Sequence, residues 1–192
     1  SGVTSLGSMT FIKKLTASSS STLSFVDGSS SVVLDNTYKE YLFTFNNIHP
    51  ATDSAEFTFQ ADTGTNTNYN QTITSTMFTA YNYENDSGTS LGYFAAFDQA
   101  QGTAFQNLQS NVSNDSDNSV NGTIQIFDPS SSVFVKHFIA NTNSMQPDSS
   151  LRLQHNHYTA GYFNTTTALT RFQFKFSSGN IDSGDICLYG IA

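Results

Sequence analysis

The closely spaced pair His155 and His157 is a candidate for binding a metal ion. Two residues apart in a β-strand, they would share one face, and neutral imidazoles on one face can chelate a transition metal with a third ligand. His137 or an acidic side chain would have to supply that ligand. The alternative is that both histidines belong to the exposed polar face of a strand, with Gln154 and Asn156 on the opposite face. No further His, Cys or Glu pattern accompanies the pair, so the sequence favours the alternative and predicts no metal site.

Asp115 and Asp117 lie in an oxygen-rich segment that resembles part of a calcium-binding loop. An EF-hand loop counted from Asp115 needs Gly at its sixth position and a later bidentate Glu. Val120 occupies the sixth position, so the pattern fails. A solvated polar loop is the favoured interpretation.

Catalytic motifs are also missing from the sequence. The many serines include no Gly-x-Ser-x-Gly nucleophile elbow, and no glycine-rich phosphate loop follows a strand pattern. The only glutamates, Glu40, Glu56 and Glu84, lie in no recognisable glycosidase arrangement. The sequence therefore predicts neither an enzyme nor a cofactor, and an enzyme such as a polysaccharide depolymerase is the least favoured hypothesis.

Composition narrows the possible partners. Only 11% of the 192 residues are charged, 14% are aromatic, and the net charge is −8. The seven basic residues are scattered, with Lys13 and Lys14 the adjacent pair, so binding to nucleic acid or to an anionic membrane surface is not expected. The chain shows no apolar run of membrane-spanning length and begins without a signal-peptide pattern, which predicts synthesis in the cytoplasm. Cys187, the single cysteine, lies in an apolar run and is expected to be a small core residue.

The sequence predicts that the secondary structure around any site consists of β-strands. Alternating or apolar β-prone runs occur at residues 9–15, 23–26, 41–45, 57–59, 72–81, 122–127, 133–140, 170–176 and 185–191. In the clearest of them, Phe172, Phe174 and Phe176 alternate with Gln173 and Lys175, which predicts that the rings point inward. Residues 95–110 are the only helix candidate, and residues 111–121 read as a polar loop.

These runs amount to roughly ten short strands separated by turn signals, a pattern typical of an all-β antiparallel sandwich with jelly-roll-like topology. We expect a single domain over residues 9–192, preceded by a flexible N-terminal arm, residues 1–8, that could order on docking. The alternative for residues 1–8 is a frayed terminus.

Without a predicted catalytic or metal site, the function is expected to depend on contacts made by surface side chains. Tyrosine is enriched at protein interfaces, although most tyrosines could equally form the edges of the core. The interface candidates are Lys13, Lys14, Tyr38, Tyr69, Tyr81, Tyr83, Tyr93 and Tyr158.

Three blocks of the sequence resemble small virion structural proteins of marine tailed bacteriophages. The first is residues 38–53 (YKEYLFTFNNIHPATD), and the second is residues 127–138 (FDPSSSVFVKHF). The third runs from residues 160–162 (AGY) through 172–181 (FQFKFSSGNI) to 188–191 (LYGI). The resemblance extends from residue 10 onward and implies a component of a phage particle, without assigning functional residues.

Two functions are compatible with that resemblance. The first is a capsid decoration, or cement, protein of the virion, working as a homo-trimer on the major capsid protein and other virion proteins. The second is a receptor- or carbohydrate-binding module of a head fibre or tail that recognises a host-surface glycan. In the block at residues 38–53, residues 46–50 are expected to form a turn. In the closing block, Gly190 is expected where another backbone or ring approaches closely.

Overall fold

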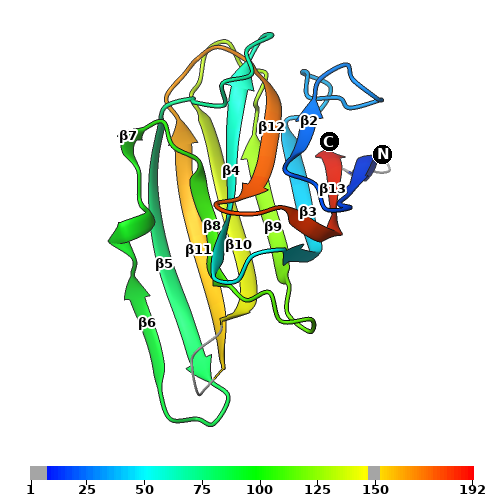
Figure 1. Ribbon diagram of the computed structural model, residues 1–192. Coiled ribbons are helices and arrows are strands. Elements are labelled where there is room, and N and C mark those ends of the chain that lie inside the picture. Colours follow the sequence, from blue (N-terminus) through cyan, green and yellow to red (C-terminus); the bar gives the residue numbers. More distant parts are fainter. Residues whose placement is uncertain (1–7, 147–151) are drawn as a thin grey trace, which may run out of the picture.

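The computed structural model describes residues 8–146 and 152–192, and most of these residues lie in antiparallel strands (Figure 1). The described part contains one short 3-10 helix, η1 (Ala95–Phe97), and no α-helix. The strands are β1 (Met9–Thr16), β2 (Leu23–Val26), β3 (Glu40–Pro50), β4 (Ala55–Thr63), β5 (Ile73–Tyr83), β6 (Thr89–Tyr93), β7 (Ala100–Gly102), β8 (Gln106–Val112), β9 (Val120–Phe127), β10 (Lys136–Gln146), β11 (Leu153–Phe163), β12 (Leu169–Phe176) and β13 (Ile181–Ile191). The predicted all-β class is confirmed.

The strands form two packed, open sheets. The larger sheet has the order β1-β13-β3-β9-β10-β11-β5-β6, with β7 also paired to β5, and the smaller sheet has the order β2-β12-β4-β8. A jelly-roll order is found in eight of these strands, β1-β13-β3-β9 in the larger sheet and β2-β12-β4-β8 in the smaller one. The chain passes from one sheet to the other between successive strands, for example from β1 to β2 and from β3 to β4. The hairpin β10–β11 and the insertion β5–β7 extend the larger sheet beyond this frame.

Aromatic side chains fill the space between the two jelly-roll sheets. Phe43 and Phe45 of β3 face Phe172 and Phe174 of β12, and all four are essentially inaccessible to solvent. The predicted inward direction of Phe172, Phe174 and Phe176 is therefore confirmed. Each buried ring removes about 150–250 Å² from water, so these aromatics supply much of the stability of a chain with few aliphatic residues.

The side chains between the two sheets become polar where β8, the edge strand of the smaller sheet, covers β10, β11 and β5. Gln106 of β8 accepts a hydrogen bond from Ser75 at 2.6 Å, and Gln109 accepts one from Thr142 at 2.9 Å. All four of these residues are buried. The sandwich therefore changes from an aromatic core at its jelly-roll end to a hydrogen-bonded layer at its extension.

Several sequence predictions of strands hold with small changes of boundary. The run at residues 23–26 coincides with β2, and the runs at residues 9–15, 72–81, 122–127 and 170–176 match β1, β5, β9 and β12 within two residues. The run at residues 133–140 is shifted, because Val133 and Phe134 are exposed and β10 begins at Lys136.

The helix candidate at residues 95–110 is wrong. Only residues 95–97 form a helical turn, and the segment then contributes β7 and β8. Gln106 pairs with Phe59 and Gln109 with Phe57 of β4, so ladder hydrogen bonds and burial override the local preference of this segment. The predicted loop at residues 111–121 is shorter than expected, since β8 ends at Val112 and β9 begins at Val120.

The turn expected at residues 46–50 is also wrong, because β3 continues through it to Pro50. A bulge absorbs the irregular sequence: the register with β9 shifts between Phe45 and Ile48, and Asn47 adopts a left-handed φ of 54°. The backbone N–H of Asn47 donates to the side chain of Asn121 at 2.9 Å, and Ile48 is fully buried. A bulge lets the strand re-aim its side chains without ending.

The close approach expected at Gly190 is confirmed. A Cβ built on Gly190 would lie 2.3 Å from the ring of Tyr38, which packs edge-on against Tyr41. Cys187 is free and buried, as predicted. The N-terminal arm lies outside the described residues except for Ser8, and no helix in the described part of the chain is long and apolar enough to cross a membrane.

Candidate functional site

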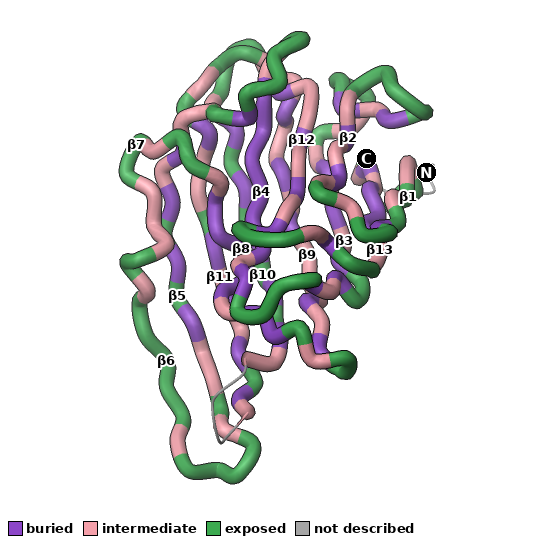
Figure 2. Tube along the Cα trace, in the orientation of Figure 1, coloured by how far each residue is buried: buried purple, intermediate pink, exposed green. Residues whose placement is uncertain are grey.

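A pocket opens where the larger sheet extends past the edge of the smaller one. In Figure 1, β5 and β6 stand apart from β2, β12 and β4, and Figure 2 shows that β6 is exposed along its length. The pocket, here called the overhang pocket, has a volume of about 370 Å³, within the range of small-molecule sites. It is lined by Thr79, Tyr81, Tyr83, Ser90, Gly92, Tyr93, Phe94, Asn111, Gln146, Leu153 and His155.

Strand alternation and register explain this lining. Tyr81 of β5 pairs with His155 of β11 on one side and Ser90 of β6 on the other, so the three side chains share the inner face of the sheet. Tyr83 follows on the same face opposite Leu153, and its ring meets that of Tyr81 edge-on at 5.7 Å. These aromatic rings form the floor of the pocket.

The polar wall comes from strand ends of both sheets. Asn111 is near the end of β8, and Gln146 is the last residue of β10. Their amides carry both donors and acceptors. None of the lining residues is Asp, Glu, Lys or Arg, so the described surface of the pocket carries no formal charge when His155 is neutral.

Two buried histidines lie at the base of the pocket. The Nε2 atoms of His155 and His157 are 3.3 Å apart, and Ser110 Oγ is 3.3 Å from His157 Nε2. Burial lowers the pKa of His155, and burial with the nearby His155 lowers the pKa of His157 to about 3. Both rings are therefore neutral near pH 7, and one ring N–H can donate to the other ring. Each Nδ1 is buried without a partner among the described residues.

The histidine predictions are resolved by these contacts. The two imidazoles share a face, as the metal hypothesis required, but His137 points to the opposite, outer face beside Tyr162. Within the described ranges, no group of three or more His, Cys, Asp or Glu side chains could hold a metal ion. The exposed-face alternative is wrong, since His155 and His157 are buried and Gln154 is exposed.

A serine–histidine pair alone does not form a catalytic centre here. Ser110 and His157 are both completely inaccessible, so no substrate reaches the hydroxyl. Desolvation dominates the low pKa of His157, whereas a triad needs an orienting carboxylate that stabilises the protonated imidazole. The pair is part of the polar layer between β8, which carries Ser110, and β11, which carries His157.

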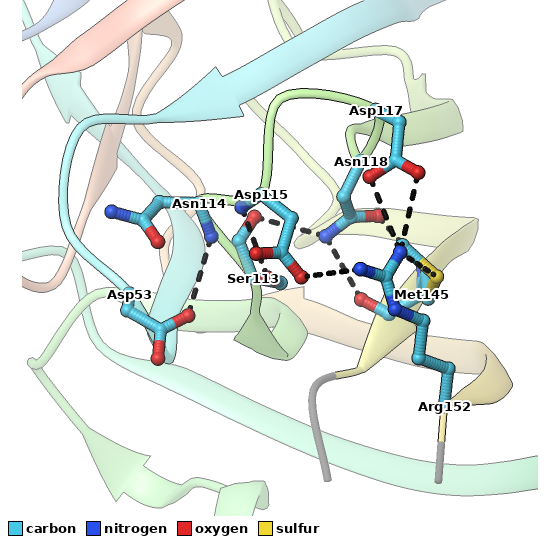
Figure 3. Close-up of polar contacts among 8 residues, drawn as sticks. All are labelled: Asp53, Ser113, Asn114, Asp115, Asp117, Asn118, Met145 and Arg152. Atoms are coloured by element: carbon cyan, nitrogen blue, oxygen red, sulfur yellow. Dashed lines mark hydrogen bonds and ion pairs between the residues drawn. The ribbon is translucent and has the colours of Figure 1, made fainter. Parts of the chain in front are cut away.

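The two carboxylates of residues 115–117 are partly neutralised by Arg152, which immediately precedes β11. Figure 3 shows the Arg152 guanidinium between the two carboxylates, 3.2 Å from both Asp115 and Asp117. Asn118 fixes the loop, because its amide nitrogen donates to the carbonyls of Ser113 and Met145, each at 2.9 Å. A cation is thus already supplied by the chain, and the polar-loop interpretation fits this arrangement better than a calcium site.

The structure brings some interface candidates together and separates others. Tyr81 and Tyr83 meet at the overhang pocket, while Tyr158 lies on the outer face of the same strands. Tyr93 borders the pocket, but its pairing with Phe78 places its side chain on the outer face. Tyr69 is only 7% exposed and is unavailable for a surface contact in this fold.

The remaining candidates lie near the N-terminal side of the larger sheet. Lys13 and Lys14 are on the edge strand β1, where Lys14 pairs with Asp185 at 3.0 Å. Tyr38 packs against the core. These three residues are remote in strand order from the overhang pocket.

A second surface feature is the outer face of the larger sheet. Along β9, β10, β11, β5 and β6, no outward-facing residue is Asp, Glu, Lys or Arg, and amides, hydroxyls and apolar groups alternate with the buried positions. Phe78 stacks on Tyr158 with ring centroids 4.8 Å apart and planes at 11°. The outer strip is defined as the exposed apolar residues of this face, Phe78, Leu91, Tyr93 and Ile139, together with the half-buried Tyr158.

Sequence reasoning missed Asn111, Gln146 and Phe94 as pocket residues. Asn111 falls in the predicted loop and Phe94 precedes the predicted helix, so no local signal places either beside Tyr81. Phe94 reaches the pocket through the pairing of β6 with β5, Gln146 through the pairing of β10 with β11, and Asn111 through the packing of β8 against β11. No protein-family model, curated protein or solved structure matches this chain.

Proposed function

We propose that this chain is a structural protein of a bacteriophage virion, a capsid decoration protein that docks on the capsid lattice and catalyses no reaction. The observation that carries the proposal is the uncharged outer face with its outer strip. Burying a charge without a partner is expensive, whereas amides, hydroxyls and rings can be buried against a complementary surface at little cost. Such a face suits a permanent contact.

The size and shape of the face support a protein partner. Five neighbouring strands spaced about 4.8 Å apart, with an average length near 30 Å, give a plane of roughly 600 Å². A standard protein interface buries about 800 Å² on each partner, so the face approaches the size of one complete interface. Two of its rings, the exposed Tyr93 and the half-buried Tyr158, are tyrosines, a residue type enriched among hot spots.

The partner in this proposal is the major capsid protein, and the location is the assembled virion. The resemblance of residues 38–53, 127–138 and 160–191 to phage virion proteins supports this choice, as does the jelly-roll strand order, which recurs in viral capsid domains. A homo-trimer would contact the repeating lattice at three points and gain avidity from the linkage.

Capsids of the encoding phage that lack this protein provide the test. Purified protein should co-sediment with them, and Ile139→Asp or Tyr158→Asp should weaken binding roughly a hundredfold, since each places a charge in a buried contact. Val133→Asp is the matched control, because Val133 is an exposed apolar residue outside the outer face. Equal binding by all variants, or no binding by the parent protein, would refute the proposal.

A further inference from the structure

We propose that the overhang pocket binds an uncharged saccharide. This site differs from the docking face, because Tyr81, Tyr83 and His155 lie on the inner face of β5 and β11 and the outer strip lies on the other. Tyr93 of β6 borders both surfaces. Three features of the pocket support the proposal: its lack of charged side chains, its mixture of rings and amides, and an unpaired nitrogen at its base.

Charge excludes most other ligand classes. A phosphate, sulfate or carboxylate group needs a cationic side chain or a cluster of backbone N–H groups, and a cationic group needs a carboxylate or an aromatic cage. No Lys, Arg, Asp or Glu is among the lining residues, and the neutral His155 adds no charge near pH 7. An anionic ligand therefore finds no charged partner in this pocket, and a cationic ligand finds no carboxylate.

The remaining chemistry requires a ligand with both an apolar face and many hydroxyl groups. The rings of Tyr81, Tyr83 and Phe94 present apolar surface, on which the C–H face of a sugar ring can lie. Asn111 and Gln146 offer amide donors and acceptors, and a hydroxyl group both donates and accepts. An apolar ligand would leave these amides desolvated and unpaired, at a cost for each group.

His155 supplies an independent indication that the pocket receives a polar group. It is only 6% exposed, it lines the pocket, and its Nδ1 has no hydrogen-bond partner among the described residues. Its other ring nitrogen is engaged by His157 at 3.3 Å. A buried polar atom without a partner is rare in folded proteins and generally marks a water or ligand site. Because this Nδ1 has essentially no accessible surface, a sugar hydroxyl reaches it only when the His155 ring turns toward the pocket.

A glycan array provides the first measurement. It should carry neutral oligosaccharides of hexoses and N-acetylhexosamines beside sialylated and sulfated oligosaccharides of the same backbones. Selective binding of one or more neutral probes is expected. Binding restricted to the acidic probes, or no binding to any probe, would overturn the proposal.

Variants then locate the site. The neutral probe bound most strongly is titrated calorimetrically with the parent protein, Tyr81→Ala, Asn111→Ala and Tyr158→Ala. Tyr81→Ala and Asn111→Ala should each weaken binding roughly tenfold or more. Tyr158→Ala is the matched control, since it removes the same side chain from the outer face of the sheet, and its affinity should stay within about twofold of the parent.

Thermal unfolding confirms that each variant is folded, and Tyr83→Ala, which removes a ring at the last position of β5, serves if Tyr81→Ala unfolds. Unchanged affinity in the pocket variants, or a loss confined to Tyr158→Ala, would refute the site. The result is independent of the capsid test, because the outer-strip variants should lose docking and keep sugar binding.

Discussion

Phe174 is the residue on which the aromatic core converges. Its ring lies within 5.2–6.3 Å, centroid to centroid, of five other phenylalanines from both sheets, namely Phe25, Phe43, Phe45, Phe57 and Phe59. Because the chain has few aliphatic residues to close a void, the loss of this ring leaves a cavity that its neighbours cannot fill.

Phe174→Ala is therefore expected to lower the free energy of unfolding by about 3–5 kcal/mol. Chemical denaturation followed by circular dichroism measures the change. Phe134→Ala is the matched control, because Phe134 is 67% exposed and its removal should cost less than about 0.5 kcal/mol. Similar losses for both variants would contradict the description of the core.

The buried histidines make a pH prediction at the same scale. His157 has an ordinary pKa of 6.5 when unfolded and about 3 when folded, because burial disfavours its charged form. The unfolded chain therefore binds a proton that the folded chain does not, and stability falls as the pH drops below 6.5. The expected slope is ~1.4 kcal/mol per pH unit for each such histidine.

Denaturation between about pH 4.5 and 7.5 isolates this effect, since Asp35 and Asp185, whose pKa values are lowered by hydrogen bonds, titrate below that window. His157→Gln should reduce the slope, while His137→Gln, on the outer face, should leave it unchanged. A parent protein with constant stability across the window would contradict the burial of the pair.

At the scale of elements, the last strand is fitted to the segment before β3. Gly190 of β13 leaves room for the Tyr38 ring, and that ring packs against Tyr41, whose hydroxyl donates to the carbonyl of Asp35 at 2.8 Å. The absence of a side chain at Gly190 thereby allows the C-terminal strand to pack against the segment that precedes β3. Burial raises the pKa of Tyr41, so this hydroxyl stays protonated as a donor.

Gly190→Ala should destabilise the protein by about 1–3 kcal/mol, because the new methyl group overlaps the ring. The double variant Gly190→Ala with Tyr38→Ala should lose less than the sum of the two single variants, as contacting residues are coupled. A double-mutant cycle in denaturant measures the coupling. Additive effects would show that the ring moves aside freely.

At the scale of the whole molecule, the two surfaces of the extended sheet have separate proposed roles. The inner surface carries the overhang pocket and the outer surface carries the outer strip. Since the outer face of β9, β10, β11, β5 and β6 has no charged residue, docking through it should not depend on ion pairs.

Docking to capsids should therefore change by less than about twofold between roughly 50 and 500 mM NaCl, conditions that screen surface charges strongly. Co-sedimentation at each salt concentration is the measurement. A steep loss of binding at high salt would indicate that the negatively charged remainder of the surface, with its net −8, makes the contact instead.

Local alternation predicted a large part of the fold. The rings of β12 and the limits of β2 follow from nearest neighbours along the strand, so the sequence carries them directly. The close approach at Gly190 follows from its missing side chain, while its partner Tyr38 is distant in the sequence. The prediction of secondary structure fails mainly at residues 95–110, which contribute β7 and β8. Residues 95–110 looked helical because their partners in β4 and β5 are distant in the sequence and leave no local trace.

Because side chains alternate along any strand with a period of two, the sequence alone predicts strands with two chemically distinct faces. Which of the two faces is covered follows from the packing of the two sheets. His155 and His157 are buried because β8 lies over them, and Lys136 is fully buried because its ammonium donates to the carbonyls of Phe134 and Thr165. Coverage depends on where the second sheet ends, and that boundary is set by strand pairings between distant residues, which no local pattern contains.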